Sequence, residues 1–368
     1  MKVAFIKYAG MAAGGAEKYL QTLACHLPKD SFDIDFYYTD DTPLIGNSFV
    51  HPATSPERIA HMEKHDINLI KVSCEARNDL PGHYSRWVNT DFFERFDASK
   101  YDLVQTGRGG YTEFPYCQMP ESLFIDSIHS QGNEGVELRD NILKTVLISR
   151  TQADTWVRNG GDSSKIEVIP TLVEVPAKKP STLRSLLNIK NDTFIFGMHQ
   201  GNREDIFSPV PLNAYAIIEN DSTCFVMLGG ANKYKEQAQQ LKLKNCFFLE
   251  FTSSVEEIND FVEGLDVFAH GRFDGEVCSA AIIEALYHGK PCLSHPAINN
   301  GHLEQLEGCG VINNSVEEYA SNMTELQNNR DFYNFLSQKS LEKWERVYKI
   351  DSCIERYIDI YKSVLPPR

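Results

Sequence analysis

The chain has 368 residues, of which 42% are hydrophobic and 24% charged, and its formal net charge is -15. This length exceeds what one hydrophobic core usually supports, so we expect two domains. The acidic balance argues against a nucleic-acid-binding surface. It also weakens any case for broad electrostatic docking on anionic lipid, and leaves at most a peripheral membrane contact through a local basic patch.

Cysteine content and the amino terminus bear on the cellular compartment. Nine cysteines are scattered along the chain without a Cys-x-x-Cys pair. This pattern fits reduced thiols better than a disulfide framework or a zinc site. Residues 1–7 are too few for a signal peptide, and no later apolar stretch reaches a membrane-spanning length. These features predict a cytoplasmic protein.

The first half of the chain alternates apolar strands with amphipathic helices. A strand at residues 2–7 is followed by a glycine-rich loop at 8–15 and a helix at 16–27. The loop's glycines do not follow the Gly-x-Gly-x-x-Gly order of dinucleotide-binding proteins. We expect further strands at 34–38, 68–72, 103–105, 123–127 and 144–148, and helices at 57–64 and 151–158. This alternation predicts a doubly wound parallel sheet.

Two polar positions in this half are candidates for function. His129 follows the expected strand at 123–127, and the polar residues 130–134 come directly after it. Open α/β sheets bind their ligands at the carboxyl ends of such strands. Asp33-Ile34-Asp35 has the pattern of a metal-binding Asp-x-Asp motif but enters a strand, so we interpret it as structural.

A proline-marked linker separates this half from a second α/β pattern. Pro170, Pro176 and Pro180 indicate a stiff connection, with a domain boundary near residue 175. Beyond it we expect strands at 194–198, 224–228, 246–249, 267–270 and 291–294. The expected helices lie at 212–219, 234–243, 255–263, 280–288, 316–326, 332–348 and 352–364. The second half is therefore predicted to be another doubly wound unit.

Two glutamates mark the segment around which this second unit is organised. Glu276 lies in the loop after the expected strand 267–270, and Glu284 lies about two turns down the following apolar helix. A carboxylate in apolar surroundings is costly to desolvate unless a partner donates hydrogen bonds to it. Paired sugar or ribose hydroxyls would do so, while the first-turn N–H groups near Cys278, Ser279 and Ala280 suit a phosphate.

With Gly289-Lys290-Pro291 after its helix, this segment resembles the E-x7-E segment of retaining glycosyltransferases of the GT-B fold (glycosyltransferase family 4-like). The resemblance implies an α/β fold of two Rossmann-like domains facing an interdomain cleft. It implies an acceptor-binding domain at residues 1–173, a nucleotide-sugar-binding domain at 174–350, and a helix at 351–368 that crosses back to the first domain.

The resemblance also implies an activity. A hexose would move from a UDP- or GDP-sugar to a hydroxyl of a glycan, lipid-linked or small-molecule acceptor, with retained configuration, in glycan biosynthesis. No cofactor and no metal ion are implied, because the nucleotide-sugar is a co-substrate. The implied catalytic residues are His129 and Glu276, both contacting the transferred sugar. The implied donor-binding residues are Gly14, Gly15, Arg203, Arg272, Cys278, Ser279, Ala280 and Glu284.

The sequence departs from the family pattern at two places. The family presents a Lys a few residues after the position of Arg203, but this chain has Glu204 and Asp205 there. Arg272 is the candidate substitute. The usual Gly-Phe-Gly after the first glutamate is replaced by Val277-Cys278-Ser279.

Three other functions stay open. They are an NAD-dependent oxidoreductase, a GT-B epimerase or phosphorylase, and a non-catalytic nucleotide-sugar-binding protein. The nucleotide base, the sugar and the acceptor are not readable, because the loops expected to choose them, at residues 84–89 and 251–252, carry no recognisable pattern.

Overall fold

The structure is a computed structural model that describes residues 1–7, 9–12, 14–39, 54–73, 91–108, 115–129, 136 and 138–365. The predicted ligand-facing residues 84–89 and 130–134 lie outside these ranges. The chain divides into two compact units. The first comprises residues 1–172 and 350–368, and the second comprises Val173–Lys349.

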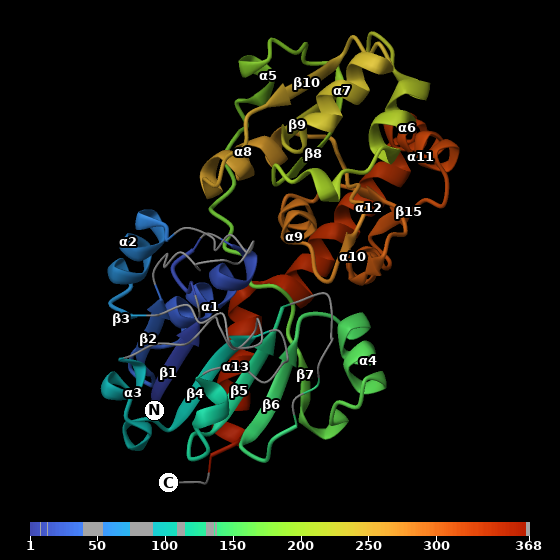
Figure 1. Ribbon diagram of the computed structural model, residues 1–368. Coiled ribbons are helices and arrows are strands. Elements are labelled where there is room, and N and C mark those ends of the chain that lie inside the picture. The colour runs from blue at the N-terminus through green and yellow to red at the C-terminus, as the bar shows by residue number, and fades with distance from the viewer. Residues whose placement is uncertain are drawn as a thin grey trace. The chain divides into compact units, whose positions relative to one another are not determined.

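The first unit is built on a parallel sheet with strand order β3-β2-β1-β4-β5-β6-β7 (Figure 1). Its strands are β1 (Lys2–Lys7), β2 (Asp33–Thr39), β3 (Asn68–Val72), β4 (Leu103–Arg108), β5 (Phe124–Ile128), β6 (Ile142–Leu147) and β7 (Ile166–Val168). In the central strand β1, Val3, Ala4, Phe5 and Ile6 are fully buried. Such an unbroken apolar run is typical of a strand covered on both faces.

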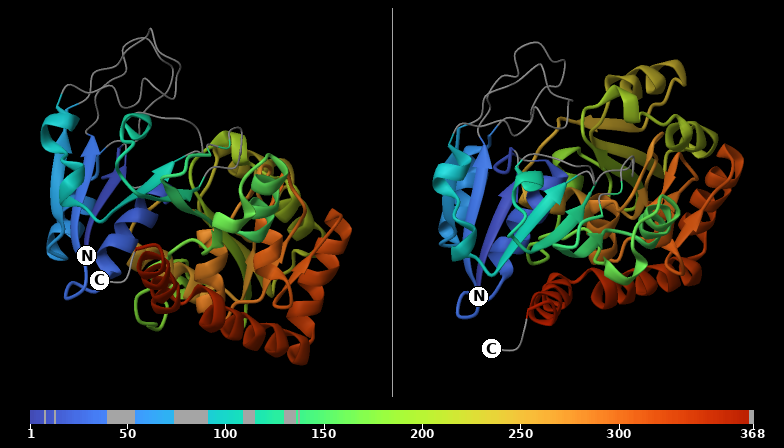
Figure 2. Two further views of the ribbon diagram at one scale, coloured as in Figure 1. Left: turned by 90° about the horizontal axis from the view of Figure 1, so that it is seen from below. Right: turned by 60° about the horizontal axis from the view of Figure 1, so that its bottom comes forward.

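Helices cover this sheet on both faces. They are α1 (Gly15–His26), α2 (Pro56–Lys64), α3 (Phe92–Arg95), α4 (Arg150–Arg158) and α13 (Ile350–Ser363). The last helix returns to the first unit, where α1 and α13 lie side by side (Figures 1 and 2). The hydroxyls of Tyr19 and Tyr357 are 2.7 Å apart, and Tyr361 donates to Gln105 of β4 at 2.8 Å. These buried hydrogen bonds attach the end of the chain to the first sheet.

The second unit has a parallel sheet of order β10-β9-β8-β11-β13-β15 and a small β12-β14 pair. The strands are β8 (Phe194–Gln200), β9 (Thr223–Gly229), β10 (Cys246–Leu249), β11 (Val267–Ala269), β12 (Gly275–Glu276), β13 (Cys292–Ser294), β14 (Asn299–Asn300) and β15 (Gly310–Ile312). The helices are α5 (Leu183–Leu186), α6 (Val210–Ile218), α7 (Asn232–Gln240), α8 (Val255–Gly264), α9 (Ala280–Tyr287), α10 (Gly301–Leu306), α11 (Val316–Asn328) and α12 (Arg330–Lys343).

These two sheets confirm the predicted doubly wound α/β architecture. Some boundaries differ from the predictions. The helix expected at 332–348 ends as α12 at Lys343 and continues as a π-helical turn at Trp344–Tyr348. Strand β15 and helix α10 were not predicted, because elements of three and six residues are too short for a periodic pattern to identify.

Candidate active site

The acidic segment lies at the carboxyl edge of the second sheet. Strand β11 ends at Ala269, and the chain passes through β12 before α9 begins at Ala280. Gly275 has a φ of +67°, and a Cβ there would lie 1.8 Å from the carbonyl oxygen of Asn299. A glycine is therefore required for β12 to approach β14. This close pairing fixes the backbone that presents Glu276.

Glu276 is held by two basic side chains. Its Oε2 lies 3.1 Å from Nε2 of His270, and its Oε1 accepts a hydrogen bond from Nη1 of Arg272 at 3.0 Å. Burial acts to raise the pKa of this carboxyl, but the hydrogen bond from His270 and the positive charge of Arg272 outweigh it and lower the pKa to about 2. Glu276 is therefore an ionised acceptor at neutral pH and not a proton donor.

Two buried histidines, His270 and His302, hold Glu276 in position. His270 Nδ1 is 2.8 Å from the Ser294 hydroxyl, so the ring is fixed at both nitrogens. His302 Nε2 is 3.0 Å from the carbonyl oxygen of His295, and His302 Nδ1 accepts the backbone N–H of Glu276 at 3.4 Å. Burial, and then the neighbouring His270, lower the pKa of His302 to about 4, so this ring is neutral at pH 7. Its tautomer is fixed, with the proton on Nε2.

Glu284 presents a different environment from Glu276. Its side chain on α9 is only 12% exposed, and its Oε2 is 2.7 Å from Nε2 of His199, at the end of β8. The two atoms face each other at ion-pair distance without forming a hydrogen bond. Both atoms are buried without a hydrogen-bond partner in the described part of the chain. Because buried polar atoms are nearly always satisfied in native proteins, this pair indicates a place where a ligand supplies the missing bonds.

The N-terminus of α9 is partly used by the protein itself. Ser279 caps the helix by accepting the N–H of Ile282. Its own N–H donates to Oε1 of Gln305 at 2.6 Å, and Gln305 Nε2 donates back to the Ser279 carbonyl at 3.0 Å. Of the three residues predicted to present amides to a phosphate, Cys278, Ser279 and Ala280, Ser279 thus has its amide engaged in this structure.

The two candidate phosphate-binding arginines differ in exposure and in their partners. The Arg203 side chain is 63% exposed and forms a two-pronged ion pair with the equally exposed Asp205. The Arg272 side chain is 18% exposed, holds Asp274 at 2.6 and 3.0 Å, and also holds Glu276. Two carboxylates already neutralise Arg272, whereas Arg203 has one, which solvent screens. The geometry favours Arg203 as the cation available to a ligand and Arg272 as a positioning residue for Glu276.

In the first unit, the predicted glycine turn caps α1. Gly14 is the N-cap of this helix, and a Cβ there would lie 2.2 Å from Oε2 of Glu17, whereas a Cβ on Gly15 would contact nothing within 4 Å. Glu17 is 3.3 Å from Nζ of Lys7, which also donates to the Gly107 carbonyl at 3.0 Å. A carboxylate with its own counter-ion therefore occupies the first turn of α1.

His129 directly follows β5, at the carboxyl edge of the first sheet. Its ring packs edge-on against Tyr19 with centroids 4.2 Å apart, and its Nε2 is buried without a hydrogen-bond partner among the described residues. Burial, and then the charge of Lys7, lower the pKa of His129 to about 3. The neutral imidazole is suited to hydrogen bonding with a hydroxyl and not to giving up a proton at pH 7.

The structure thus places the predicted residues in two groups. Along the carboxyl edge of the second sheet lie Arg203, Arg272, Glu276, Cys278, Ser279, Ala280 and Glu284. In the first unit, Gly14, Gly15 and His129 lie at the carboxyl ends of β1 and β5. The residues of this site that sequence reasoning missed are His199, His270, His302 and Gln305. His199 is the next-to-last residue of β8 and His270 directly follows β11, so the strand-end rule that selected His129 would have found both.

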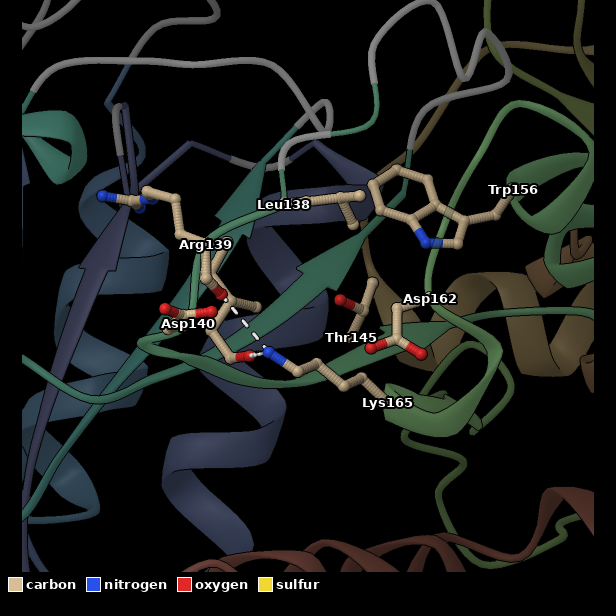
Figure 3. A pocket seen from close by; sticks show the side chains of 8 residues that line it. Leu138, Arg139, Asp140, Thr145, Trp156, Asp162 and Lys165 are labelled. Atoms are coloured by element: carbon tan, nitrogen blue, oxygen red, sulfur yellow. Dashed lines mark hydrogen bonds between the residues drawn. The ribbon is translucent and has the colours of Figure 1, made fainter.

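A separate pocket of about 140 Å³ lies in the first unit (Figure 3). Arg139, Asp140, Asp162 and Lys165 contribute charges of both signs to its lining, and Trp156 closes one side. These residues precede β6 and β7 or lie near the end of α4, so the pocket is at the amino edge of the sheet. Open α/β sheets bind substrates at the opposite edge, so this pocket is not part of the candidate site.

None of the described helices combines the length and the apolar character needed to cross a membrane.

Comparisons with known proteins bear on the family and on the fold. Residues 210–343 match the model of the family described as glycosyl transferases group 1. No curated protein matches the chain in sequence. A glycosyltransferase from Rickettsia africae ESF-5 shares the fold, with a TM-score of 0.75 at 14% identity over 100% of this chain and 99% of its own.

Two further solved structures also align over nearly their full lengths. HepE of Anabaena in complex with UDP and glucose has a TM-score of 0.72 at 16% identity, over 99% of this chain and 100% of its own. Sucrose-phosphate synthase of Thermosynechococcus elongatus has a TM-score of 0.72 at 15% identity, over 99% of both chains. These matches confirm the predicted fold class and enzyme class. Residues 210–343 match the glycosyl transferases group 1 family model, which supports a transferase, and the chain has the two-sheet GT-B fold of these solved structures.

Proposed function

We propose that this glycosyltransferase moves a hexose from a UDP- or GDP-sugar to an acceptor hydroxyl, with retention of configuration and without a metal ion or other cofactor. One observation carries the proposal. Glu284 and His199 form a buried pair whose facing oxygen and nitrogen lack hydrogen-bond partners in the described part of the chain. A ribose carries two adjacent hydroxyls, each of which both donates and accepts, so it satisfies a carboxylate and an imidazole together.

Glu276 and His129 are proposed to bind the transferred sugar. With a pKa near 2, the Glu276 carboxylate is an acceptor for sugar hydroxyls held in place by His270 and Arg272. Glycoside hydrolases need one carboxyl that stays protonated near neutral pH, and Glu276 does not meet that requirement. His129, neutral and with an unsatisfied Nε2, accepts or donates a single hydrogen bond to a sugar hydroxyl.

The leaving diphosphate is proposed to be neutralised by Arg203, assisted by the N-terminal end of α9 at Ala280 and by the turn at Gly14 and Gly15. Arg203 must exchange Asp205 for the phosphate, and this exchange costs little because the ion pair is largely exposed. A guanidinium matches phosphate oxygens through two parallel hydrogen bonds. Cationic side chains and backbone amides then stabilise the charge that develops on the leaving group.

The reaction follows from these roles. The bond between the anomeric carbon and the diphosphate oxygen breaks, and the acceptor oxygen bonds to the same carbon on the same face. The acceptor proton passes to the departing diphosphate, so no protein base is required. The HepE structures contain UDP, glucose or UDP-glucose, which supports a nucleotide-sugar donor for a chain of the same fold. Glycan, lipid-linked and small-molecule acceptors, a role in glycan biosynthesis and a cytoplasmic location all stay predictions.

The test is a panel of UDP-, GDP- and ADP-sugars, screened first by thermal shift and then by nucleotide release in the presence of EDTA. We expect one nucleotide class to raise the melting temperature and to be turned over without metal. NMR of the product should show the anomeric configuration of the donor. Glu257→Gln, at an exposed glutamate of α8, is the matched control for Glu284→Gln.

Three results would contradict parts of this proposal. Binding without turnover on any acceptor would identify a non-catalytic nucleotide-sugar-binding protein. Turnover without an acceptor alcohol would identify an epimerase or a phosphorylase. Activity lost in EDTA and restored by manganese or magnesium would exclude the metal-independent reaction.

A further inference from the structure

Three side chains of metal-ligating types meet between the C-terminal end of α1 and the end of α2. Cys25 lies near the end of α1, and His61 and His65 lie on the last turn of α2 and at its C-cap. The Cys25 sulfur and one ring nitrogen from each histidine all lie within 4.8 Å of one another. A thiol and two imidazoles are the ligand types that zinc and copper prefer in proteins.

The spacing of the two histidines explains why they share a face. They are four residues apart, which places their rings one above the other on a helix, with centroids 4.6 Å apart. The same spacing carries paired zinc ligands in helical metal sites. This group has no Cys-x-x-Cys pattern in the sequence, because Cys25 lies 36 residues before His61.

Hydrogen bonding prepares His65 to be a ligand. Its Nδ1 lies 2.9 Å from the carbonyl oxygen of His61, an acceptor that fixes the ring proton on Nδ1. The lone pair is then on Nε2. Metal-bound histidines usually donate their second ring nitrogen to a carbonyl or carboxylate in this way, because that contact sets the tautomer and the ring orientation.

The distances require only small movements to close around an ion. In a tetrahedral zinc site with bonds of about 2.0–2.3 Å, neighbouring ligand atoms are about 3.3–3.8 Å apart. The observed upper limit of 4.8 Å therefore calls for shifts on the order of 1 Å. Cys25 is buried whereas His61 and His65 are partly exposed, so the group has a protected thiol and a route for entry from solvent.

We propose that Cys25, His61 and His65 bind one Zn²⁺ ion, with a water molecule as the fourth ligand. The ion joins the C-terminal end of α1 to α2. These helices already share the hydrogen bond from Arg58 to Gln21 at 2.5 Å, and the N–H of Ser55, the N-cap of α2, donates to the carbonyl oxygen of Met11 in the loop before α1 at 2.9 Å. Because the unfolded chain does not hold the three ligands together, binding stabilises the first unit by an amount that grows with the logarithm of the ion's concentration relative to its dissociation constant. The role assigned to the ion is stabilisation of the first unit.

Met62 makes copper(I) the competing ion. Its thioether sulfur is 3.4 Å from the Cys25 sulfur, and copper(I) binds soft sulfur ligands strongly. The observations favour zinc, because two of the three clustered ligands are imidazoles and zinc sites combine imidazole with thiolate. Preferential binding of copper(I) is accordingly one outcome of the test.

The experiment uses the full chain, stripped of metal and titrated with Zn²⁺ against a chromophoric chelator. We expect one zinc per chain and a higher melting temperature with zinc than without it. Cys25→Ala and His65→Gln should each weaken zinc binding at least tenfold. His26→Gln is the matched control. Its ring lies 6.4 Å from that of His65, and its Nδ1 contacts the Thr22 carbonyl oxygen, but it is outside the group.

Two measurements separate lost ligands from lost folding. The metal-free variants should melt within a few degrees of the metal-free wild type, so that their weaker binding reflects the missing ligand. Cobalt(II) should give a thiolate-to-metal charge-transfer band that disappears in Cys25→Ala and persists in His26→Gln. No zinc bound by the wild-type chain in the titration, equal affinity in Cys25→Ala, or binding of copper(I) in preference to zinc would each overturn the proposal.

Discussion

Replacing Glu276 with glutamine removes the charge that organises the second unit's site. The carboxylate accepts hydrogen bonds from His270 and Arg272, and its pKa is lowered from 4.5 to about 2. At about 1.4 kcal/mol per tenfold change in proton affinity, this difference corresponds to about 3 kcal/mol of folding free energy. The value is an upper bound for the substitution, because a glutamine oxygen still accepts a hydrogen bond.

The stability difference between the wild type and Glu276→Gln should shrink as the pH falls. A carboxyl whose pKa is lower in the folded state contributes its full stabilisation above the unfolded pKa, near 4.5, and loses it as the pH falls toward 2. The wild type should exceed Glu276→Gln in stability by at most about 3 kcal/mol at pH 7 and by at most about 2 kcal/mol at pH 3.5.

Differential scanning calorimetry of both proteins from pH 3.5 to 7.5 measures this difference. The comparison between the two proteins is informative even if the two units unfold in separate steps. Glu257→Gln, at the exposed position on α8, should leave the pH dependence unchanged. If Glu276→Gln and the wild type lose stability in parallel as the pH falls, or if NMR places the Glu276 pKa near 4.5, the electrostatic account is wrong.

Three further predictions concern single residues. Arg203→Ala should lower kcat roughly 100- to 1,000-fold, because it removes a donor to the developing charge, with only partial recovery in Arg203→Lys; a silent Arg203→Ala beside a damaging Arg272→Ala would reverse their roles. Glu284→Gln should weaken nucleotide binding by about 1.5–3 kcal/mol in calorimetry, and unchanged affinity would remove it from the ribose site. The pKa of His129 is lowered to about 3, so the folded chain binds this proton less readily than the unfolded chain and stability should fall as the pH drops below about 6.5. His129→Gln should flatten this part of the melting-temperature profile, and an unchanged profile would show that the ring is not held neutral.

Local sequence was sufficient to predict the two sheets and the position of the acidic segment. Strand β1 is an unbroken buried run, and the spacing from Glu276 to Glu284 follows directly from a strand end and a helix. Such patterns are readable because side-chain periodicity depends only on the local backbone conformation. For the same reason His199, at the end of β8, was readable in principle but was not selected.

Only the tertiary structure decided which groups face one another. The contact between His199 and Glu284 joins two elements 85 residues apart, and Gln305 reaches the Ser279 amide from α10. The two arginines look alike in sequence, but burial and two neighbouring carboxylates distinguish Arg272 from Arg203. The chain's local pattern specifies its strands and helices, whereas partners, protonation and exposure depend on distances between segments that the fold alone brings together.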